Sequence, residues 1–409
     1  MSHPGARRRL TFQGNLRETR HGWLRLTPAY SVHLVRELLD EPGRAARPVL
    51  DPFCGTGTTA LTCGERGFAC DTVDLNPFLV WLARAKSARY TPATIDRARA
   101  RVHAMAAAAE RRTSPAPWLP PIYRIDRWWH PDTARALGHA LHTLRHAEPR
   151  ATRAGDLARL ALCRAVIETS NVSFAHQSMS FRNRDPRDAS RGHGPASVAD
   201  ALHRAIDSMA RAAIAPAHSS QPRVLQGDSR DLTTVLGQHR YGTVVTSPPY
   251  PNRMSYIREL RPYMYWLGYL TDRRGAGELD WRVIGGTWGS ATSRLADWQP
   301  DPLLAVPFSD LSRIARDIEL RSEILSRYVL RYFQDMTAHI RSLCRVLARG
   351  ARVHYVVGNS KFYDVIVPVQ EIYAALFESV GLRRVHITEL RKRTSKSELF
   401  EYLVTARRA

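Results

Sequence analysis

The sequence predicts an α/β protein in which helices cover a largely parallel sheet. Short apolar runs rich in β-branched residues alternate with segments of helical periodicity, which is typical of strands joined by crossover helices. The chain has 409 residues, of which 44% are hydrophobic and nine are tryptophan, so it can form a large core with insertions. The runs expected to form strands are 48–51, 70–75, 223–227, 242–247 and 352–358.

Two further runs, 383–390 and 400–406, lie close together with a basic turn between them. We expect them to pair as an antiparallel hairpin at the end of the sheet, because a short turn can join antiparallel strands but not parallel ones. This pair completes the predicted set of strands.

Two insertions interrupt the alternation of strands and helices. The first, 91–222, is rich in Ala, Arg, Leu and His with helical periodicity, so we expect it to be mostly helical. The second, 251–325, carries aromatic residues and arginines. The chain therefore divides into a first sheet part, a helical insertion, two central strands, a second insertion and the remainder of the sheet; the ranges are 1–90, 91–222, 223–250, 251–325 and 326–409.

The net charge is +22, which favours a polyanionic partner such as nucleic acid. Lysine occurs only at positions 86, 361, 392 and 396, so nearly all of the 60 basic residues are arginine, and genome base composition is an alternative source of the excess. No apolar stretch approaches the roughly 20 residues that cross a bilayer. The five cysteines form no C-x-x-C pair, which fits buried free thiols in a reducing cytoplasm better than a metal site.

A glycine turn follows the first predicted strand in "VLDPFCGTGTTA" (49–60). Gly55 and Gly57 let the backbone turn tightly and approach a ligand, and the free N–H groups at the start of the next helix attract an anionic group. The spacing departs from the dinucleotide-binding pattern, because Ala60 stands where a third glycine would fall. No Gly-Lys-Ser/Thr follows, so the turn is not a phosphate-binding P-loop either.

Acidic side chains end two further strands. Asp74 closes the second strand, where a carboxylate can accept hydrogen bonds from both ribose hydroxyls of a nucleoside, or can cap the next helix. Asp228 ends the third strand and is placed to contact an adenine amino group. Together with the glycine turn, these strand ends predict a nucleoside cofactor without strong negative charge.

The stretch "VVTSPPYPNRMSY" (244–256) ends a strand with a hydroxyl, two prolines and an aromatic ring. Pro248 and Pro249 forbid helix and lack backbone donors, so they form a stiff extended corner. Most Pro-Pro pairs are simple turns. An active site is the alternative here, since Ser247 and Tyr250 would be held rigidly at the tip of the strand.

These motifs resemble those of the amino-methylating DNA methyltransferases. "DPFCGTG" is similar to the cofactor motif of that family, and "TSPPY" (246–250) to its catalytic motif. The segment 21–39 resembles the helix that closes over the cofactor, with Thr27 and Pro28 as the match, and 353–382 resembles the strand and helix after the catalytic strand. The resemblance implies a class I, Rossmann-like methyltransferase sheet of seven strands, with S-adenosylmethionine as cofactor. It implies cofactor-binding roles for Thr27, Pro28, Asp51, Phe53, Gly55, Gly57, Asp74 and Asp228.

The resemblance also implies a chemistry for Ser247, Pro248, Pro249 and Tyr250. An exocyclic amino nitrogen is a poor nucleophile, because its lone pair is delocalised into the base. The Ser247 oxygen and the Pro248 carbonyl would accept its two protons, and Tyr250 would stack on a base flipped out of the duplex. In this family, serine at the first position goes mostly with cytosine N4, whereas aspartate or asparagine goes mostly with adenine N6.

The DNA-reading segment is expected within one of the two insertions. Guanidinium and amide groups there can pair phosphates or read guanine edges, or can form solvated basic faces. The candidates are Arg182, Arg184, Asn252, Arg253, Arg258 and Arg261.

Several other functions stay open on the sequence alone. Methylation of adenine N6 in DNA, or of an RNA base, would use the same fold, and a non-catalytic DNA-binding subunit could retain it. A nicotinamide-dependent oxidoreductase is disfavoured by the glycine spacing and the charge. A cytosine 5-position enzyme needs a nucleophilic cysteine after proline, and the sequence has no Pro-Cys pair. No nuclease signature stands out, so a restriction or defence partner would be a separate protein.

Overall fold

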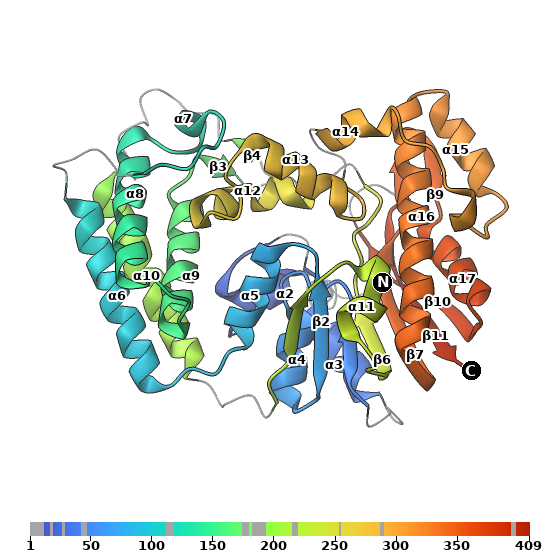
Figure 1. Ribbon diagram of the computed structural model, residues 1–409, viewed down its shortest axis with the longest axis horizontal. Coiled ribbons are helices and arrows are strands. Elements are labelled where there is room, and N and C mark those ends of the chain that lie inside the picture. The colour runs from blue at the N-terminus through green and yellow to red at the C-terminus, as the bar shows by residue number, and fades with distance from the viewer. Residues whose placement is uncertain are drawn as a thin grey trace.

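A computed structural model describes residues 12–16, 19–26, 29–41, 47–111, 118–173, 180–181, 194–214, 220–252, 255–286, 290–393 and 398–409. Two structural regions stand side by side in it: an α/β sheet and a bundle of helices (Figure 1). Helices α12 (Tyr256–Leu267) and α13 (Arg273–Arg282) extend from the bundle across the upper edge of the sheet (Figure 1).

The main sheet has seven strands in the order β10-β11-β7-β6-β1-β2-β5, as predicted. Their bounds are β1 Val49–Asp51, β2 Cys70–Asp74, β5 Arg223–Gln226, β6 Tyr241–Thr246, β7 Leu347–Gly358, β10 Leu382–Lys392 and β11 Phe400–Arg408. The strands β5, β2, β1, β6 and β7 run parallel, and β11 pairs antiparallel with both β7 and β10. The predicted C-terminal hairpin is therefore confirmed.

The chain order reverses between β1 and β6, because β2 and β5 follow on one side of β1 while β6 and β7 lie on the other. In open parallel sheets, ligands bind outside the carboxyl ends of the strands at such a reversal. Both strands are buried along their whole length, which explains why their sequences are apolar runs rather than alternating patterns.

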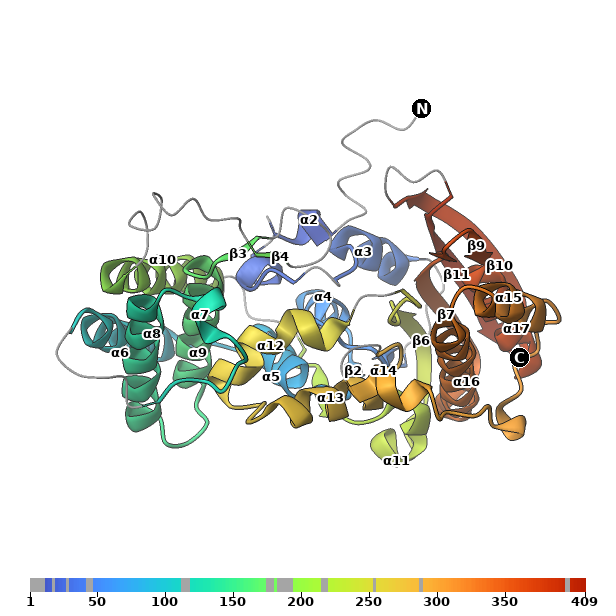
Figure 2. The same cartoon turned by 90° about the horizontal axis from the view of Figure 1, so that it is seen from above.

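Helices cover both faces of the sheet (Figure 2). One apolar core joins α3 (Val32–Asp40) and α4 (Thr58–Arg66) to one face. A larger core joins the other face to α11 (Leu232–Leu236), α16 (Glu323–Val346) and α17 (Val369–Ser379). The outer strand β10 is mostly exposed.

The helical bundle comes from the first insertion. Its helices are α6 Pro92–Glu110, α7 Ile125–Trp128, α8 Pro131–Ala147, α9 Arg153–Glu168 and α10 Pro195–Ala213. A short hairpin, β3 (Val172–Ser173) with β4 (Ser180–Phe181), lies among them. Their shared core is rich in alanine and continues into α5 (Pro77–Ser87) and α12 (Tyr256–Leu267), so the bundle and the sheet are packed together through these two helices.

The second insertion contributes α12, α13 (Arg273–Arg282), α14 (Ser290–Leu295) and α15 (Leu311–Glu319). The remaining elements are α2 Phe12–Asn15, β8 Ser360–Phe362, β9 Val365–Val367 and the 3-10 turns His21–Trp23, Ser229–Asp231 and Pro302–Leu304. Within the described residues, no helix is long and apolar enough to cross a membrane, and no cluster of side chains is suited to hold a metal ion.

Candidate active site

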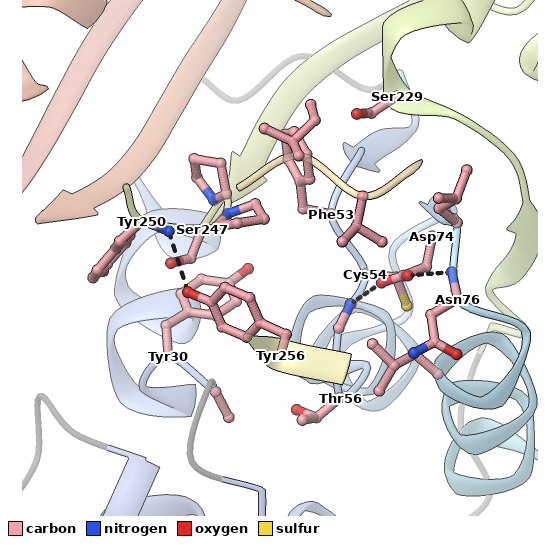
Figure 3. A pocket seen from close by; sticks show the side chains of 18 of the residues that line it. Tyr30, Phe53, Cys54, Thr56, Asp74, Asn76, Ser229, Ser247, Tyr250 and Tyr256 are labelled. Carbon is pink, nitrogen blue, oxygen red and sulfur yellow. Dashed lines mark hydrogen bonds between the residues drawn. The ribbon is translucent and has the colours of Figure 1, made fainter. Parts of the chain in front are cut away.

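A cavity of about 260 Å³ opens at the carboxyl ends of β1, β2 and β6, where the strand order reverses (Figure 3). It brings together many of the predicted site residues. Those that line it are Phe53, Gly55, Asp74, Asp228, Ser247, Pro248, Pro249, Tyr250 and Asn252. The glycine turn and the Pro-Pro turn, which are almost 200 residues apart in the chain, thus face one space.

The glycine turn has one residue that faces the cavity and one that serves packing. Gly55 has a φ of 51°, and its N–H donates a hydrogen bond of 2.8 Å to Asp74. Gly57 has a φ of 80° and caps α4, and a Cβ there would lie 2.9 Å from the Cβ of Ala83. Gly57 is outside the cavity lining, so its role here is to let α4 and α5 approach closely.

Asp74 occupies the wall of the cavity opposite the Pro-Pro turn (Figure 3). Besides Gly55, its carboxylate accepts a hydrogen bond of 2.8 Å from the backbone N–H of Asn76. The side chain that caps α5 is Asn76, which accepts from Phe78, so Asp74 itself is not the helix cap. Burial raises the pKa of Asp74 to about 7.

Asp51 lies beneath the cavity rather than on its surface. Its fully buried carboxylate accepts hydrogen bonds from the Thr246 hydroxyl at 2.6 Å and from the Phe53 N–H at 3.0 Å. Burial raises its pKa, while these donors favour the charged form. Asp51 therefore joins the end of β1 to the end of β6 and holds the two turns in a fixed relation.

Asp228 and Phe53 shape the end of the cavity near β5. Burial alone would raise the pKa of Asp228, but hydrogen bonds and the charge of Arg230, 2.7 Å away, bring that pKa below its ordinary value. Arg230 also pairs with Asp335. The Phe53 ring packs edge-on against buried His339, with 4.7 Å between ring centroids. This end thus combines a carboxylate that stays charged with an aromatic ring.

The Pro-Pro turn is fixed by hydrogen bonds from three directions. The Ser247 hydroxyl donates to the Val356 carbonyl of β7 at 3.1 Å, and the Pro249 carbonyl accepts from Tyr332 at 2.7 Å. The Tyr250 N–H donates to the Tyr256 hydroxyl at 3.2 Å (Figure 3). Because the Ser247 proton points to β7, the lone pairs of its oxygen remain available as acceptors.

The Tyr250 ring is held by β7 and the C-terminal hairpin. Its hydroxyl donates to Glu401 at 2.9 Å, and Glu401 in turn accepts from Arg391 at 2.8 Å. The guanidinium carbon of Arg393 lies 5.1 Å from the ring centroid. A Cβ on Gly358 would lie 2.7 Å from a guanidinium nitrogen of Arg393 and 2.9 Å from a carbon of the Tyr250 ring, so only glycine leaves room for both side chains in these positions.

Gly358→Ala tests this arrangement of Tyr250. For the methyl transfer that the motifs imply, we expect the rate to fall about tenfold or more, since the new methyl group must displace the ring and Arg393, while the cofactor Kd stays within about twofold. Single-turnover rates and equilibrium titration with cofactor measure the two effects. Gly275→Ala on α13 is the control, because its new methyl group meets no atom closer than 3.4 Å. An unchanged rate in Gly358→Ala would show that the ring position does not matter.

The predicted nucleic-acid-binding residues are only partly placed by the structure. Arg258 is exposed on α12, whereas Arg261 is half-buried against Trp128, and burial lowers its pKa to about 10. Asn252 lines the cavity. The candidates Arg182, Arg184 and Arg253, and the predicted cofactor residues Thr27 and Pro28, lie outside the described residues.

Sequence reasoning missed other residues that line the cavity. These are chiefly Tyr30, Tyr256, Arg391, Arg393 and Glu401. The last three come from the C-terminal hairpin, which reaches the carboxyl end of β7 beside the cavity because β11 pairs Glu401 with Gly358. The predicted pairing of the two last strands, together with the basic residues at 391–393, was the available signal for these three residues. No short sequence motif marks them as part of the site.

The sheet is that of a class I, Rossmann-like methyltransferase, as predicted, and S-adenosylmethionine is the methyl donor of such enzymes. No protein-family model matches the chain. The chain is 21% identical to the type II methyltransferase M.BsoBI of Geobacillus stearothermophilus, over 96% of its own length and 84% of the relative's. It is 22% identical to the type II methyltransferase M.AvaI of a Nostoc species and of Anabaena variabilis, over 92% of its length and 82% of theirs. The similarity to these enzymes supports a methyltransferase activity for the chain.

Among solved structures, the rRNA methyltransferase aviRa from Streptomyces viridochromogenes matches with 13% identity and a TM-score of 0.29, over 97% of this chain and 96% of that one. A likeness this distant carries no argument about the substrate.

Proposed function

We propose that the protein is a DNA methyltransferase that modifies the N4 amino group of a cytosine flipped out of the duplex. The observation that carries the proposal is the Ser247 oxygen, whose lone pairs are available in a cavity that Asp74 also lines. Ser247 could accept a hydrogen bond from the amino group of a base, and Asp74 could accept hydrogen bonds from a ribose. Because both residues line one cavity, it could hold the base and a nucleoside cofactor together.

The residues present fit S-adenosylmethionine. Asp74 has two backbone donors and keeps lone pairs for ribose hydroxyls, while Asp228 and Phe53 would hold the adenine by an amino contact and ring packing. Thr27, Pro28 and Gly55 remain proposed cofactor residues, while Asp51 and Gly57 support the turn without lining the cavity. When bound, the cofactor supplies an electrophilic methyl group on a sulfonium sulfur.

The Pro-Pro turn would prepare the amino nitrogen for transfer. The Ser247 oxygen and the Pro248 carbonyl would accept its two hydrogen bonds, which draws the nitrogen towards tetrahedral geometry and exposes its lone pair. The Pro249 carbonyl already accepts from Tyr332, so it serves to fix the turn. After transfer the nitrogen loses one proton. A neutral hydroxyl such as that of Ser247 is too weak a base to keep this proton, so it passes to solvent.

Tyr250 would stack on the flipped base. A ring fixed by Gly358, Glu401 and Arg393 has little conformational freedom to lose when the base arrives, so stacking orients the base at small entropic cost.

The pH dependence of cofactor binding tests the role of Asp74. Only the carboxylate accepts two ribose hydrogen bonds, and its pKa is about 7, so the cofactor Kd should rise as the pH falls through 7. We expect the Kd to be about tenfold higher at pH 6 than at pH 8.5. Equilibrium dialysis measures it, with Asp74→Asn as the variant that should lose the dependence. A flat wild-type profile would remove Asp74 from the ribose contact.

DNA is the proposed partner on the strength of the net charge of +22 and the similarity to type II methyltransferases. The insertions 91–222 and 251–325 are the proposed DNA-reading segments, with Arg258 and Asn252 among the contacts. A separate nuclease or defence partner and a cytoplasmic location are part of the same proposal. Serine at the first motif position favours cytosine over the alternatives, which are adenine N6 and an RNA base.

Product analysis tests the proposed function directly. The protein is incubated with S-adenosylmethionine and either duplex DNA or RNA, and the digested nucleosides are identified by mass spectrometry. N4-methyldeoxycytidine is the expected product. N6-methyldeoxyadenosine would refute the base assignment, and a product found only in RNA would refute DNA as the substrate.

A further inference from the structure

A second hollow, of about 280 Å³, lies on the sheet away from the active site. It is formed by β7, β11 and β10 beside the end of α3. Arg352, which lines it, pairs with Thr243 near the start of β6, whereas the active-site cavity opens where β6 ends. Along β7, Arg352 lies four residues, or about 13 Å, before Val356, whose carbonyl accepts from Ser247. His354 lies two residues before Val356 and is the part of the hollow nearest to the active site.

Basic side chains gather in this hollow because of the strand register. Arg352 on β7 and Arg407 on β11 are direct cross-strand partners, and His354 and His386 both pair with Thr405. Cross-strand partners project from the same face of a sheet, so these groups share one surface. Arg384, in the irregular stretch of β10, adds a third guanidinium to the lining.

The charges of the hollow are not balanced. Like charges directly opposite each other destabilise a sheet. Glu41 supplies a carboxylate, 3.3 Å from Arg352 and 4.0 Å from the Nε2 atom of His354. Within the described part of the chain, no carboxylate forms an ion pair with Arg384 or Arg407, so the hollow keeps a net positive charge.

His354 adds a buried polar group at the base of the hollow. It is only 4% exposed, and neither ring nitrogen makes a hydrogen bond with any of the described residues. Burial, together with the charges of Arg352 and Arg407, lowers its pKa to about 4. The imidazole is therefore neutral at pH 7 and keeps one N–H that can donate to a ligand.

We propose that this hollow binds a phosphate group, with Arg384 and Arg407 as the charged donors and His354 as a neutral donor. Guanidinium groups bind phosphate through paired N–H donors, and the bound anion would relieve the repulsion between the strands. The phosphate comes either from a free anion or from the backbone of nucleic acid. The site is independent of methyl transfer.

Thermal unfolding of the full chain tests the phosphate site without cofactor or substrate. At pH 7.5 and equal ionic strength, 50 mM sodium phosphate should raise the Tm by about 2 °C or more relative to sodium chloride. Arg384→Gln/Arg407→Gln should lose this rise, whereas Arg345→Gln, at an exposed arginine of α16, should keep it. His354→Gln, which preserves the three arginines, should weaken it and serves if the double variant does not fold. A rise no larger than that in chloride, or a double variant that responds like the wild type, would overturn the site.

Binding to duplex DNA of arbitrary sequence identifies the source of the phosphate. If the backbone of DNA supplies it, the double variant should reduce the slope of log K against log salt concentration by about 2 relative to Arg345→Gln. An unchanged slope, with the Tm response to phosphate still lost, assigns the hollow to a free anion. Neither readout involves product formation, so a failure of the proposed methyltransferase function would not mimic a failure of this site.

Discussion

Ser247→Ala is expected to lower kcat about 100-fold while leaving the Kd for S-adenosylmethionine within about twofold. The hydroxyl donates its proton to Val356 and presents its lone pairs to the cavity, so alanine would remove the acceptor that we propose activates the amino nitrogen. Loss of one group that acts on developing charge in a transition state has effects of this size. Single-turnover methylation and cofactor titration on the same preparations give the two numbers.

Ser247→Thr is the matched variant, since it keeps the hydroxyl and adds one methyl group. It should retain a rate within about tenfold of the wild type. If alanine weakens cofactor binding as much as catalysis, Ser247 holds the structure of the turn and does not assist the reaction.

Asp74→Ala is expected to raise the Kd for S-adenosylmethionine about 100-fold. The carboxylate would accept ribose hydroxyls, and hydrogen bonds to a charged group contribute roughly 1.5–3 kcal/mol each. Alanine also frees the N–H groups of Gly55 and Asn76, so the glycine turn loses part of its support. Titration calorimetry measures the affinity, and saturating cofactor should restore much of the rate.

Asp71→Asn provides the comparison for Asp74. Asp71 is on the same strand but its carboxylate accepts from Tyr241 and lies outside the cavity. Its replacement should leave the cofactor Kd within about twofold even where the protein is less stable. Equal losses of affinity in both variants would point to damage of β2 rather than to a ribose contact.

The strands and the two turns could be predicted from the sequence because each is encoded locally. Val49–Asp51 and Tyr241–Thr246 are continuous apolar runs, and the glycines and prolines that follow them restrict the backbone in recognisable ways. Local patterns do not distinguish a residue that faces a ligand from one that supports the turn. Asp51 and Gly57, for example, belong to the cofactor motif, yet both lie outside the cavity lining.

The residues around Tyr250 could not be predicted, because their positions depend on strand pairing. Glu401 is 151 residues from Tyr250 in the chain, and they meet only because β11 turns back along β7. No local pattern in the hairpin indicates a contact with the Pro-Pro turn. The same pairing aligns Arg352 with Arg407, a juxtaposition that periodicity alone cannot indicate.

The buried hydrogen bond between Asp51 and Thr246 connects two positions 195 residues apart. The relation between the glycine turn and the Pro-Pro turn is thereby set by neighbouring strands and not by the chain that runs between them. That intervening chain includes the whole helical bundle. A change in the length of the bundle would therefore leave the Asp51–Thr246 contact between the two strands in place. In the proposed DNA methyltransferase, such a modular arrangement would let the recognition segment change without altering the site of methyl transfer.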